Sequence, residues 1–329
     1  MRKLILGASL TGTSLCWWNQ GHMIIAKIAE NELSTKHPDV WDRVNEVLRL
    51  IDTRKEKLHP FVESATFADV YNKKLYGDKG KVDPYLDLFE ANAELVNTDA
   101  HWHYADKAFF DGIEPQEAEG AEMAELNVIE AIRRLQDNLT GLEATREVSY
   151  RIRCLIHYIG DLHQPLHSVS RFTAKQPRGD YGGNGYWISS YGAFRNLHSL
   201  WDSGMNKYVK GINPPLNDYK EWPMLSQFAE DISGEYPRSA VDAESLDPQV
   251  WADESYELAL GFVYVDIVDP EKLPYKWVYD EYLDEGLKHC HRRMAQAGYR
   301  LADTLVAAFG ETDDVTNHSV AQLLKTIPQ

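Results

Sequence analysis

The sequence predicts a mainly α-helical protein built as a single domain. Along much of its 329 residues, apolar side chains recur three and four positions apart, which is the spacing of one face of an α-helix. Neither a strand–helix–strand alternation nor a phosphate-binding glycine loop interrupts this pattern. An apolar fraction of 43% with 26% charged residues is typical of a folded, soluble protein that can bury a substantial core.

Residues 1–16 are predicted to be a secretion signal. Two basic residues follow the first methionine, and residues 4–10 form a short apolar run. Ser14 and Cys16 provide the small side chains expected at positions −3 and −1 of a cut before Trp17. We therefore expect a secreted protein, which would be extracellular or, in a bacterium, periplasmic. The alternative is an N-terminal segment that stays attached.

Residues 17–329 are expected to form the single helical domain. Helices are predicted over residues 22–49, 122–139, 148–162, 247–263 and 276–309. In the second of these, Leu126 and Ile129 begin the apolar face, and Pro165 closes the third. Between residues 165 and 197, glycines alternate with aromatic residues, which predicts a loop with a short hairpin that lies over a site.

The charge of the chain limits the class of partner. A formal charge of −17 argues against a protein that binds nucleic acid through a basic patch, and removal of the signal would make the charge −19. Bound divalent cations would reverse the sign locally. The acidity therefore counts against a basic DNA-binding module more than against a protein that binds an anionic substrate through metal ions. No apolar run is long enough to span a bilayer, so no membrane span is expected.

Two pairs of residues indicate possible covalent modification. Asn138 and Asn317 each begin a glycosylation acceptor sequence, which is used if the source is a eukaryote. Cys154 and Cys290 remain after removal of the signal, and after export they could form one disulfide. Two buried thiols are an equally good interpretation, because neither cysteine spacing is that of a zinc knuckle or a redox pair.

The strongest chemical signal is a repeated pairing of histidine with aspartate. His157 and Asp161 are four residues apart in a predicted helix, so both side chains project from one face. A proline then stops the helix and allows His167 to approach the same place, and His198 and Asp202 repeat the spacing. Imidazole and carboxylate are the ligands that zinc takes when no thiolate is offered. One such pair is weak evidence for a metal site, but two pairs together with a third histidine predict one.

Three residues upstream complete the candidate set. Asp69 follows an apolar stretch, His103 lies between two aromatic residues, and His22 comes five residues after the predicted new N-terminus. Each of these residues taken singly is more often a core or surface polar residue than a ligand. Their value lies in their order along the chain.

These motifs together resemble a known enzyme family. They are Trp17-x-x-x-Gly21-His22, Ala68-Asp69, Trp102-His103-Tyr104, His157-Tyr-Ile-Gly-Asp161, Gln164-Pro-Leu-His167, Gly-Gly-Asn184 and Asn196-Leu-His198-Ser-Leu-Trp-Asp202. As an ordered set they are similar to the secreted zinc-dependent single-strand nucleases of fungi, plants and protists, the nuclease S-one/P-one or type I family. The resemblance covers most of the chain from Trp17 to about Phe309. It implies the helical fold shared with zinc-dependent phospholipase C, with long loops over a trinuclear zinc cleft.

The resemblance also implies the metal ligands. One zinc would be held by Asp69, His103 and His157, and Asp161 would bridge it to a second zinc. The second zinc would also be held by His22 and by the α-amino nitrogen and carbonyl oxygen of Trp17. A third, more exposed zinc would be held by His167, His198 and Asp202. The amine ligand gives the signal a chemical role, because before the cut this nitrogen is an amide that cannot donate a lone pair.

The implied activity is endonucleolytic hydrolysis of single-stranded DNA and RNA to 5′-phosphate products, with 3′-nucleotidase activity on 3′-mononucleotides. A hydroxide that bridges two zinc ions would be the nucleophile, with Asp69 and Asp161 as the catalytic carboxylates. Single-strand preference follows if a base leaves the duplex and stacks on an aromatic ring. The resemblance assigns this stacking to Tyr104, for which a packing role is the alternative, and a further substrate contact to Asn184. Asp106 could accept hydrogen bonds from the edge of the base.

Two alternatives differ in residues that can be read directly. A zinc-dependent phospholipase C predicts glutamate as the last ligand and a shorter gap between the final two histidines, so Asp202 and the long glycine-rich stretch favour the nuclease. A non-catalytic zinc-binding protein has no need of Asp69 or Asp161, and both are present. No protein partner is predicted.

Overall fold

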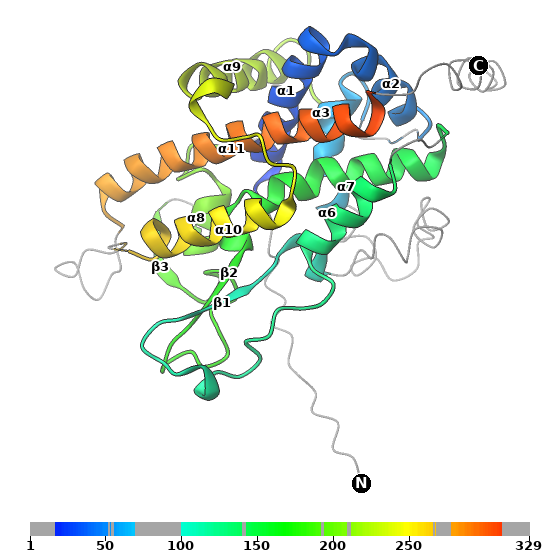
Figure 1. The fold of residues 1–329 in the computed structure, drawn as a ribbon. Coiled ribbons are helices and arrows are strands. Elements are labelled where there is room, and N and C mark those ends of the chain that lie inside the picture. The colour runs from blue at the N-terminus through cyan, green and yellow to red at the C-terminus, as the bar shows by residue number, and fades with distance from the viewer. Residues whose placement is uncertain are drawn as a thin grey trace, which may run out of the picture.

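The computed structural model confirms the mainly helical prediction (Figure 1). It describes residues 17–51, 53, 56–69, 100–139, 143–191, 194–208, 212–265, 267 and 278–310. The predicted secretion signal, Asn317 and the start of the last predicted helix lie outside these residues. In the part of the chain described here, no helix has the length and apolarity needed to cross a membrane.

The helices and strands follow one another with short connections. The α-helices are α1 (Asn19–Lys36), α2 (Pro38–Leu48), α3 (Pro60–Glu63), α6 (Val128–Asp137), α7 (Arg146–Leu162), α8 (Leu197–Asp202), α9 (Glu221–Glu235), α10 (Pro248–Leu258) and α11 (Asp280–Phe309). The short 3₁₀ segments are η1 (Ser64–Thr66), η2 (Ala100–His103), η3 (Pro115–Glu117), η4 (Pro165–His167) and η5 (Arg238–Ala240), and η6 (Ala259–Val263) is a π-helical continuation of α10. The strands are β1 (Lys107–Phe110), β2 (Val169–Phe172), β3 (Trp187–Tyr191) and β4 (Phe194–Asn196).

The predicted helix over residues 22–49 is two helices. His37 leaves the helical conformation (φ −138°, ψ 58°), although its amide still donates to the Leu33 carbonyl. Pro38 then begins α2 at the position where its missing N–H costs nothing. The turn sends α2 in a new direction from α1 without interrupting the apolar periodicity that led to the single-helix prediction.

The predicted helix over residues 122–139 begins later than expected, at Val128. Asn127 is extended (φ −126°, ψ −178°), and its side-chain oxygen accepts hydrogen bonds from the amides of Ile129 and Glu130. This N-cap fixes the first turn of α6. The prediction for Leu126 was therefore wrong, because this side chain precedes the helix and is 40% exposed.

Two small sheets flank the helices. β3 and β4 form the expected hairpin, with Trp187 opposite Asn196. The pairing of β1 with β2 was not predicted, because the two strands are parallel and far apart in sequence, with Lys107 opposite Val169. Helix α9 was also not predicted. The parallel pair matters for the site, since β1 directly follows the segment containing His103 and β2 directly follows η4.

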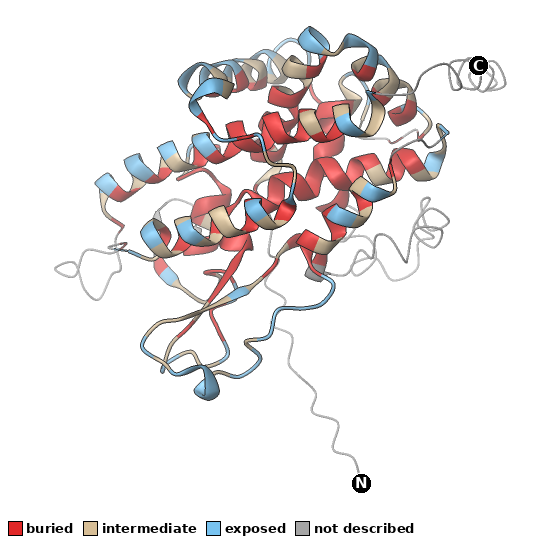
Figure 2. Ribbon diagram, viewed as in Figure 1, coloured by how far each residue is buried: buried red, intermediate tan, exposed pale blue. Residues whose placement is uncertain are grey.

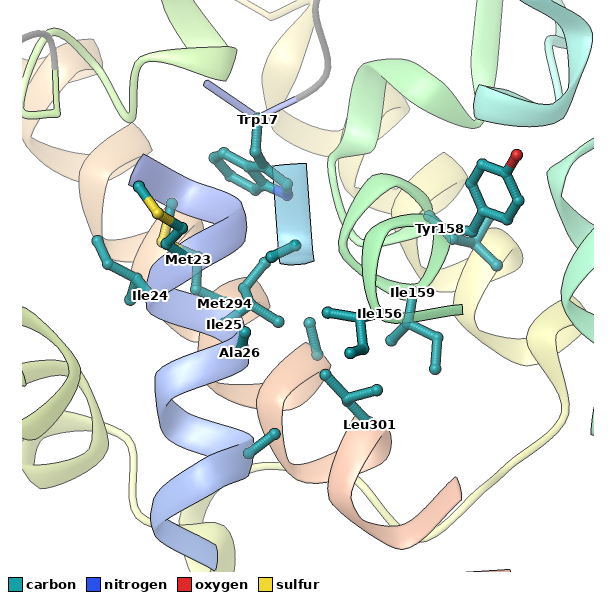
Figure 3. Close-up of a cluster of buried hydrophobic side chains, with 14 of the residues drawn as sticks. Trp17, Met23, Ile24, Ile25, Ala26, Ile156, Tyr158, Ile159, Met294 and Leu301 are labelled. Atoms are coloured by element: carbon teal, nitrogen blue, oxygen red, sulfur yellow. The ribbon is translucent and has the colours of Figure 1, made fainter. Parts of the chain in front are cut away.

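The core is formed where α1, α7 and α11 pack together. Figure 2 shows α7 and the middle of α11 as largely buried, with exposed residues toward the end of α11 where it begins. In Figure 3, Ile25 from α1, Ile156 from α7 and Leu301 from α11 are side by side in one apolar cluster, with Trp17 at the start of α1. Cys154 and Cys290 are both free and buried, so the structure favours two thiols over a disulfide.

Candidate metal centre

Three groups of histidine and aspartate in the described residues could each hold a metal ion. The first is Asp69, His103 and His157; the second is His22, His157 and Asp161; the third is His167, His198 and Asp202. Within each group the candidate ligand atoms all lie within 4.8 Å of one another. All eight side chains are buried. The structure thus brings together every side chain that the sequence analysis selected as a metal ligand.

The scaffold explains how distant residues meet. His22 comes from α1, His157 and Asp161 from α7, and His198 and Asp202 from α8. Short segments supply the remaining side chains: Asp69 just after η1, His103 at the end of η2 and His167 at the end of η4. The Ala105 amide donates to the His167 carbonyl at 2.7 Å, so the start of the β1–β2 pairing fixes the distance between two of these short segments.

Asp161 lies at the centre of the first two groups. Its Oδ1 is 3.2 Å from His22 Nε2, and its Oδ2 is 2.9 Å from His103 Nδ1 and 3.3 Å from His157 Nε2. The ring of His22 stacks on that of His157, with centroids 4.0 Å apart. The two oxygens of one carboxylate therefore face different imidazoles, as is required of a residue that bridges two ions.

Asp202 has a different surrounding. Its Oδ2 is 3.4 Å from His198 Nε2, and its Oδ1 is 4.0 Å from His167 Nε2. Oδ1 also accepts a 2.7 Å hydrogen bond from the side-chain amide of Gln164. His167 links this group to the centre, because its Nδ1 is 4.0 Å from Asp161 Oδ1.

Backbone carbonyls select the tautomer of three histidines. The Nδ1 atoms of His157, His167 and His198 lie 2.7, 2.6 and 2.6 Å from the carbonyl oxygens of Ala65, His103 and Gly182. Because a carbonyl oxygen only accepts, each Nδ1 carries the hydrogen and donates it. In the neutral form of each ring, Nε2 is then left with a lone pair directed into its group, which is the arrangement that metal-binding histidines share.

Buried atoms without hydrogen bonds show that the site fits a metal. In the part of the chain that is described, both ring nitrogens of His22, Nε2 of His167 and Oδ1 of Asp161 have no hydrogen-bond partner although they are buried. Such atoms cost free energy unless something else satisfies them. Nitrogen and oxygen lone pairs grouped in this way match the preference of zinc and similar divalent ions.

The electrostatics of the two carboxylates differ in direction. Burial raises the pKa of Asp161, but His157, His103 and His22 outweigh burial and bring that pKa well below its ordinary value. Burial raises the pKa of Asp202 well above its ordinary value, and the Gln164 hydrogen bond opposes this shift only in part. Asp161 is thus stabilised by the charge of His157 and by its contacts with the imidazoles of His103 and His22, whereas among the described residues Asp202 has the neutral amide of Gln164 as its stabilising partner.

The histidines of the second group are split in the same way. Burial lowers the pKa of His22 to about 4, so its ring is neutral and offers one nitrogen lone pair at physiological pH. Burial also opposes the charge on His157, but Asp161 and Asp69 outweigh it and raise the pKa to about 9. In the absence of other cations, His157 therefore carries the positive charge that Asp161 needs.

The first described residues are tied to both ligand-bearing helices. Trp17 is fully buried, and its indole N–H donates to the Gly160 carbonyl at 3.0 Å. The Trp18 amide donates to the Asp202 carbonyl, also at 3.0 Å. The segment that begins at Trp17 therefore connects the α7 residue next to Asp161 with the last residue of α8.

Two glycines at the site were not selected from the sequence. A Cβ atom on Gly160 would lie 2.6 Å from His22 Nδ1, so only glycine lets α1 and α7 approach closely enough for the second group. Gly182 has φ +63°, and a Cβ atom there would lie 2.3 Å from the Leu166 carbonyl oxygen. Both glycines occur within the quoted motifs, but their packing partners are distant in sequence.

Two of the predicted substrate-contacting residues closely follow His103 in the chain, and the third, Asn184, comes two residues after Gly182, whose carbonyl accepts from His198. Tyr104 directly follows His103 and is partly buried. Asp106 has a left-handed backbone (φ 52°), and burial, with the nearby charge of Asp180, raises its pKa to about 7. Near neutral pH this carboxyl can therefore donate as well as accept, whereas the sequence analysis expected an acceptor. The Asn184 amide donates to the Tyr181 carbonyl at 2.9 Å.

The third group differs from expectation in its exposure. The third group is not more exposed than the others, since His167, His198 and Asp202 are 1–3% exposed whereas Asp69 and His103 are each 7% exposed.

His163, at the C-terminal end of α7, uses both ring nitrogens to hold the scaffold together and belongs to none of the three groups. Its Nδ1 donates to the Ile159 carbonyl, and its Nε2 accepts from Arg300 at 3.0 Å.

Comparison with known proteins agrees with this geometry. Residues 17–310 match the S1/P1 Nuclease family. Endonuclease 5 of Arabidopsis thaliana is 30% identical over 160 residues, which are 47% of this chain and 49% of that protein. Nuclease S1 of Aspergillus oryzae is 24% identical over 302 residues, 87% of this chain and 89% of that protein. Nuclease P1 of Penicillium citrinum is 28% identical over 178 residues, 52% and 61% respectively. The chain spans about half the length of the plant relatives that it matches.

Proposed function

The chain belongs to the S1/P1 nuclease family, and we propose that it is a secreted zinc-dependent endonuclease that hydrolyses phosphodiester bonds of single-stranded DNA and RNA. We further propose that its products carry 5′-phosphates and that it removes the 3′-phosphate of mononucleotides. The observation that carries this proposal is the convergence of three histidine–aspartate groups around Asp161.

The proposed centre holds three zinc ions. The ligands would be Asp69, His103, His157 and Asp161 for the first ion, Asp161, His22 and the amine and carbonyl of Trp17 for the second, and His167, His198 and Asp202 for the third. Asp161 would bridge the first two, in keeping with its two oxygens facing different histidines. When bound, these ions supply a nucleophile derived from water near neutral pH and positive charge for the departing oxygen.

The carboxylates prepare the attack. Asp69 is buried but keeps 7% exposure, and one of its oxygens lies 3.8 Å from His157 Nε2. From this position it can accept a hydrogen bond and orient the attacking water toward the phosphorus. Asp161 is fully buried and held by imidazoles on several sides, so it would fix the geometry without entering the reaction as a base.

The charge of the centre decides whether an anionic strand can approach. The chain has a formal charge of −17, and three of the eight side chains in the three groups, Asp69, Asp161 and Asp202, are carboxylates that repel phosphate when they are ionised without metal. Three divalent ions add six positive charges at this one place. Substrate binding is therefore expected to depend on metal more strongly than on any basic side chain.

Single-strand preference follows from burial of the centre. A phosphate reaches such recessed ions only if the adjacent base leaves its duplex and stacks elsewhere. Tyr104 offers a partly buried ring directly after His103, and Asp106, two residues further along the chain, offers a carboxyl with a pKa of about 7. We assign the base to these two residues and a further contact to Asn184.

The N-terminus has a role in this proposal. We propose that residues 1–16 are a removed secretion signal and that residues 17–329 form one domain. Trp17 is buried beside the second group, held by its indole hydrogen bond to Gly160. Removal of the signal would convert its amide nitrogen into an amine that can bind metal.

The test is hydrolysis by the purified chain that begins at Trp17, with single-stranded and duplex DNA of one sequence as substrates. We expect cleavage of the single strand with 5′-phosphate ends and loss of activity in Asp161→Asn by at least about 100-fold, because that carboxylate bridges two ions. Asp137→Asn, an exposed change at the end of α6, is the matched control. Equal activity of both variants would contradict the assignment of Asp161.

The same preparation distinguishes the related phospholipase reaction. A phosphocholine ester offered in place of DNA should remain intact. Hydrolysis of that ester without cleavage of single strands would replace the nuclease proposal with a phospholipase-like one.

A further inference from the structure

We propose that Gln164 is the positioning residue of the third metal group, because it orients Asp202 and fixes His167 at the same time. This inference rests on the proposed function, since it assumes that His167, His198 and Asp202 bind an ion. It concerns a residue that does not itself ligate metal or contact substrate.

The orientation of the Gln164 amide is determined by its neighbours. Its Oε1 accepts a hydrogen bond from the Leu166 amide at 2.7 Å, and because an N–H needs an acceptor, the oxygen must be on that side. Its Nε2 is then directed at Asp202 Oδ1, also at 2.7 Å. The side chain is fully buried, so water does not compete for either bond.

This hydrogen bond makes the two oxygens of Asp202 unequal. Oδ1 is engaged by the amide and is 4.0 Å from His167 Nε2, whereas Oδ2 is 3.4 Å from His198 Nε2. The amide thereby fixes the rotation of the carboxylate and directs Oδ2 toward the space between the histidines. Partners of this kind hold ligating carboxylates in place and are needed for full metal affinity.

Gln164 also fixes the second ligand of the group. The backbone carbonyl of Gln164 accepts from the His167 amide at 2.9 Å, and the hydrogen bond from the Leu166 amide to the Gln164 side chain closes the same short turn, η4. Asp202 belongs to a different helix, 38 positions along the chain. One side chain therefore joins the two segments that must hold a constant separation for the third ion.

The first two groups do not share this dependence. Among the described residues, the Asp161 carboxylate is surrounded by the imidazoles of His22, His103 and His157 and has no amide donor of this type. Removal of the Gln164 side chain should therefore weaken one ion of three and leave the other two.

The experiment compares three variants of the chain that begins at Trp17. Gln164→Met removes both hydrogen bonds, and Gln164→Glu keeps an oxygen for Leu166 but replaces the donor that faces Asp202. Gln296→Met is the matched control, because Gln296 is a buried glutamine with partners on both sides, Arg293 and the Asp242 carbonyl, away from the metal groups. Zinc per chain is measured by mass spectrometry across graded zinc concentrations, and folding by circular dichroism.

We expect both Gln164 variants to keep two tightly held zinc ions and to bind the third about 10–100-fold more weakly, with activity restored by added zinc. Gln296→Met should hold three. If Gln164→Met fails to fold, Gln164→Glu decides. Third-ion affinity within about 2-fold of wild type in a folded Gln164 variant would overturn the inference. A wild-type chain without zinc would instead refute the proposed function, so the two failures are distinguishable.

Discussion

The two halves of the metal centre are stabilised in different ways. Around Asp161, the protein itself compensates for burial, because the charge of His157 and the contacts with His103 and His22 outweigh burial and lower the pKa of the carboxyl. Around Asp202, burial dominates and the pKa is raised, with Gln164 as a neutral donor. The half around Asp161, which comprises the first two groups and is called the inner half, is thus partly balanced before any ion binds. The half around Asp202, which comprises the third group and is called the outer half, needs an ion to balance its charge.

Chelation should have the largest effect on stability and should remove metal from the two halves in a fixed order. The inner ions would each have four donors and share Asp161, whereas the third would have only three side chains, so it should leave first as chelator increases. Loss of all three should lower the melting temperature by about 10–20 °C, because each tightly bound ion contributes about 4 kcal/mol. Zinc content and melting are followed in parallel, and an unchanged melting temperature at zero zinc would count against the centre.

Gly160→Ala is expected to damage the inner half alone. The new methyl group would lie 2.6 Å from His22 Nδ1, and such overpacking costs about 1–3 kcal/mol. We predict loss of the second ion with the third retained, measured as zinc per chain. Gly234→Ala on α9 is the control, since nothing lies within 4 Å of its added methyl group and alanine favours a helix. Equal zinc content in both variants would contradict the packing argument.

Gly182→Ala is the counterpart for the outer half. Its backbone has φ +63°, its Cβ would lie 2.3 Å from the Leu166 carbonyl oxygen, and its own carbonyl accepts from His198. We expect a loss of about 1–3 kcal/mol in stability and a weaker third ion. Gly112→Ala has a similar φ of +67° with nothing within 4 Å, so it isolates backbone strain from the displacement of His198. If both changes spare the third ion equally, Gly182 does not position that histidine.

Acid should weaken the scaffold behind both halves by a smaller amount. Burial raises the pKa of Glu254, but Arg300 and Arg293 outweigh it, so the folded-state pKa lies below the ordinary value of 4.5. Stability from this carboxylate is present above that ordinary value and is lost as pH falls through the folded-state pKa. Glu254→Gln should remove less than about 1 kcal/mol of this dependence, since the group is partly solvated.

Urea unfolding at pH 6 and at pH 4 measures the change, with zinc held constant. Glu257→Gln, an exposed change on the same helix, is the control. A Glu254→Gln chain whose stability fell between these pH values as steeply as that of wild type would show that the ion pairs contribute nothing.

Helix content and the histidine–aspartate set were accessible from the sequence because both depend on short spacings. His157 and Asp161 are four apart on one helix, and Pro165 follows the end of that helix as predicted. Pro38, in contrast, begins a second helix where a single one was predicted. The failure at Leu126 has a local cause, since the Asn127 N-cap could have been recognised before the apolar run.

Other features depend on contacts between distant segments. Gly160 is required because α1 brings His22 against it, and Gln164 matters because α8 brings Asp202 to its amide. The burial of the third group likewise results from the loop around Gly182, whose carbonyl faces His198. Spacing along the chain predicts which residue types gather, but not which neighbours fix their orientation.

The most direct test of the account is to locate the metal by anomalous diffraction above and below the zinc edge, in crystals of the chain that begins at Trp17. We predict three zinc peaks: one among Asp69, His103 and His157, one beside His22 and the Trp17 amine, and one among His167, His198 and Asp202. Zinc absent from these groups in a chain with a free Trp17 amine would contradict the central claim.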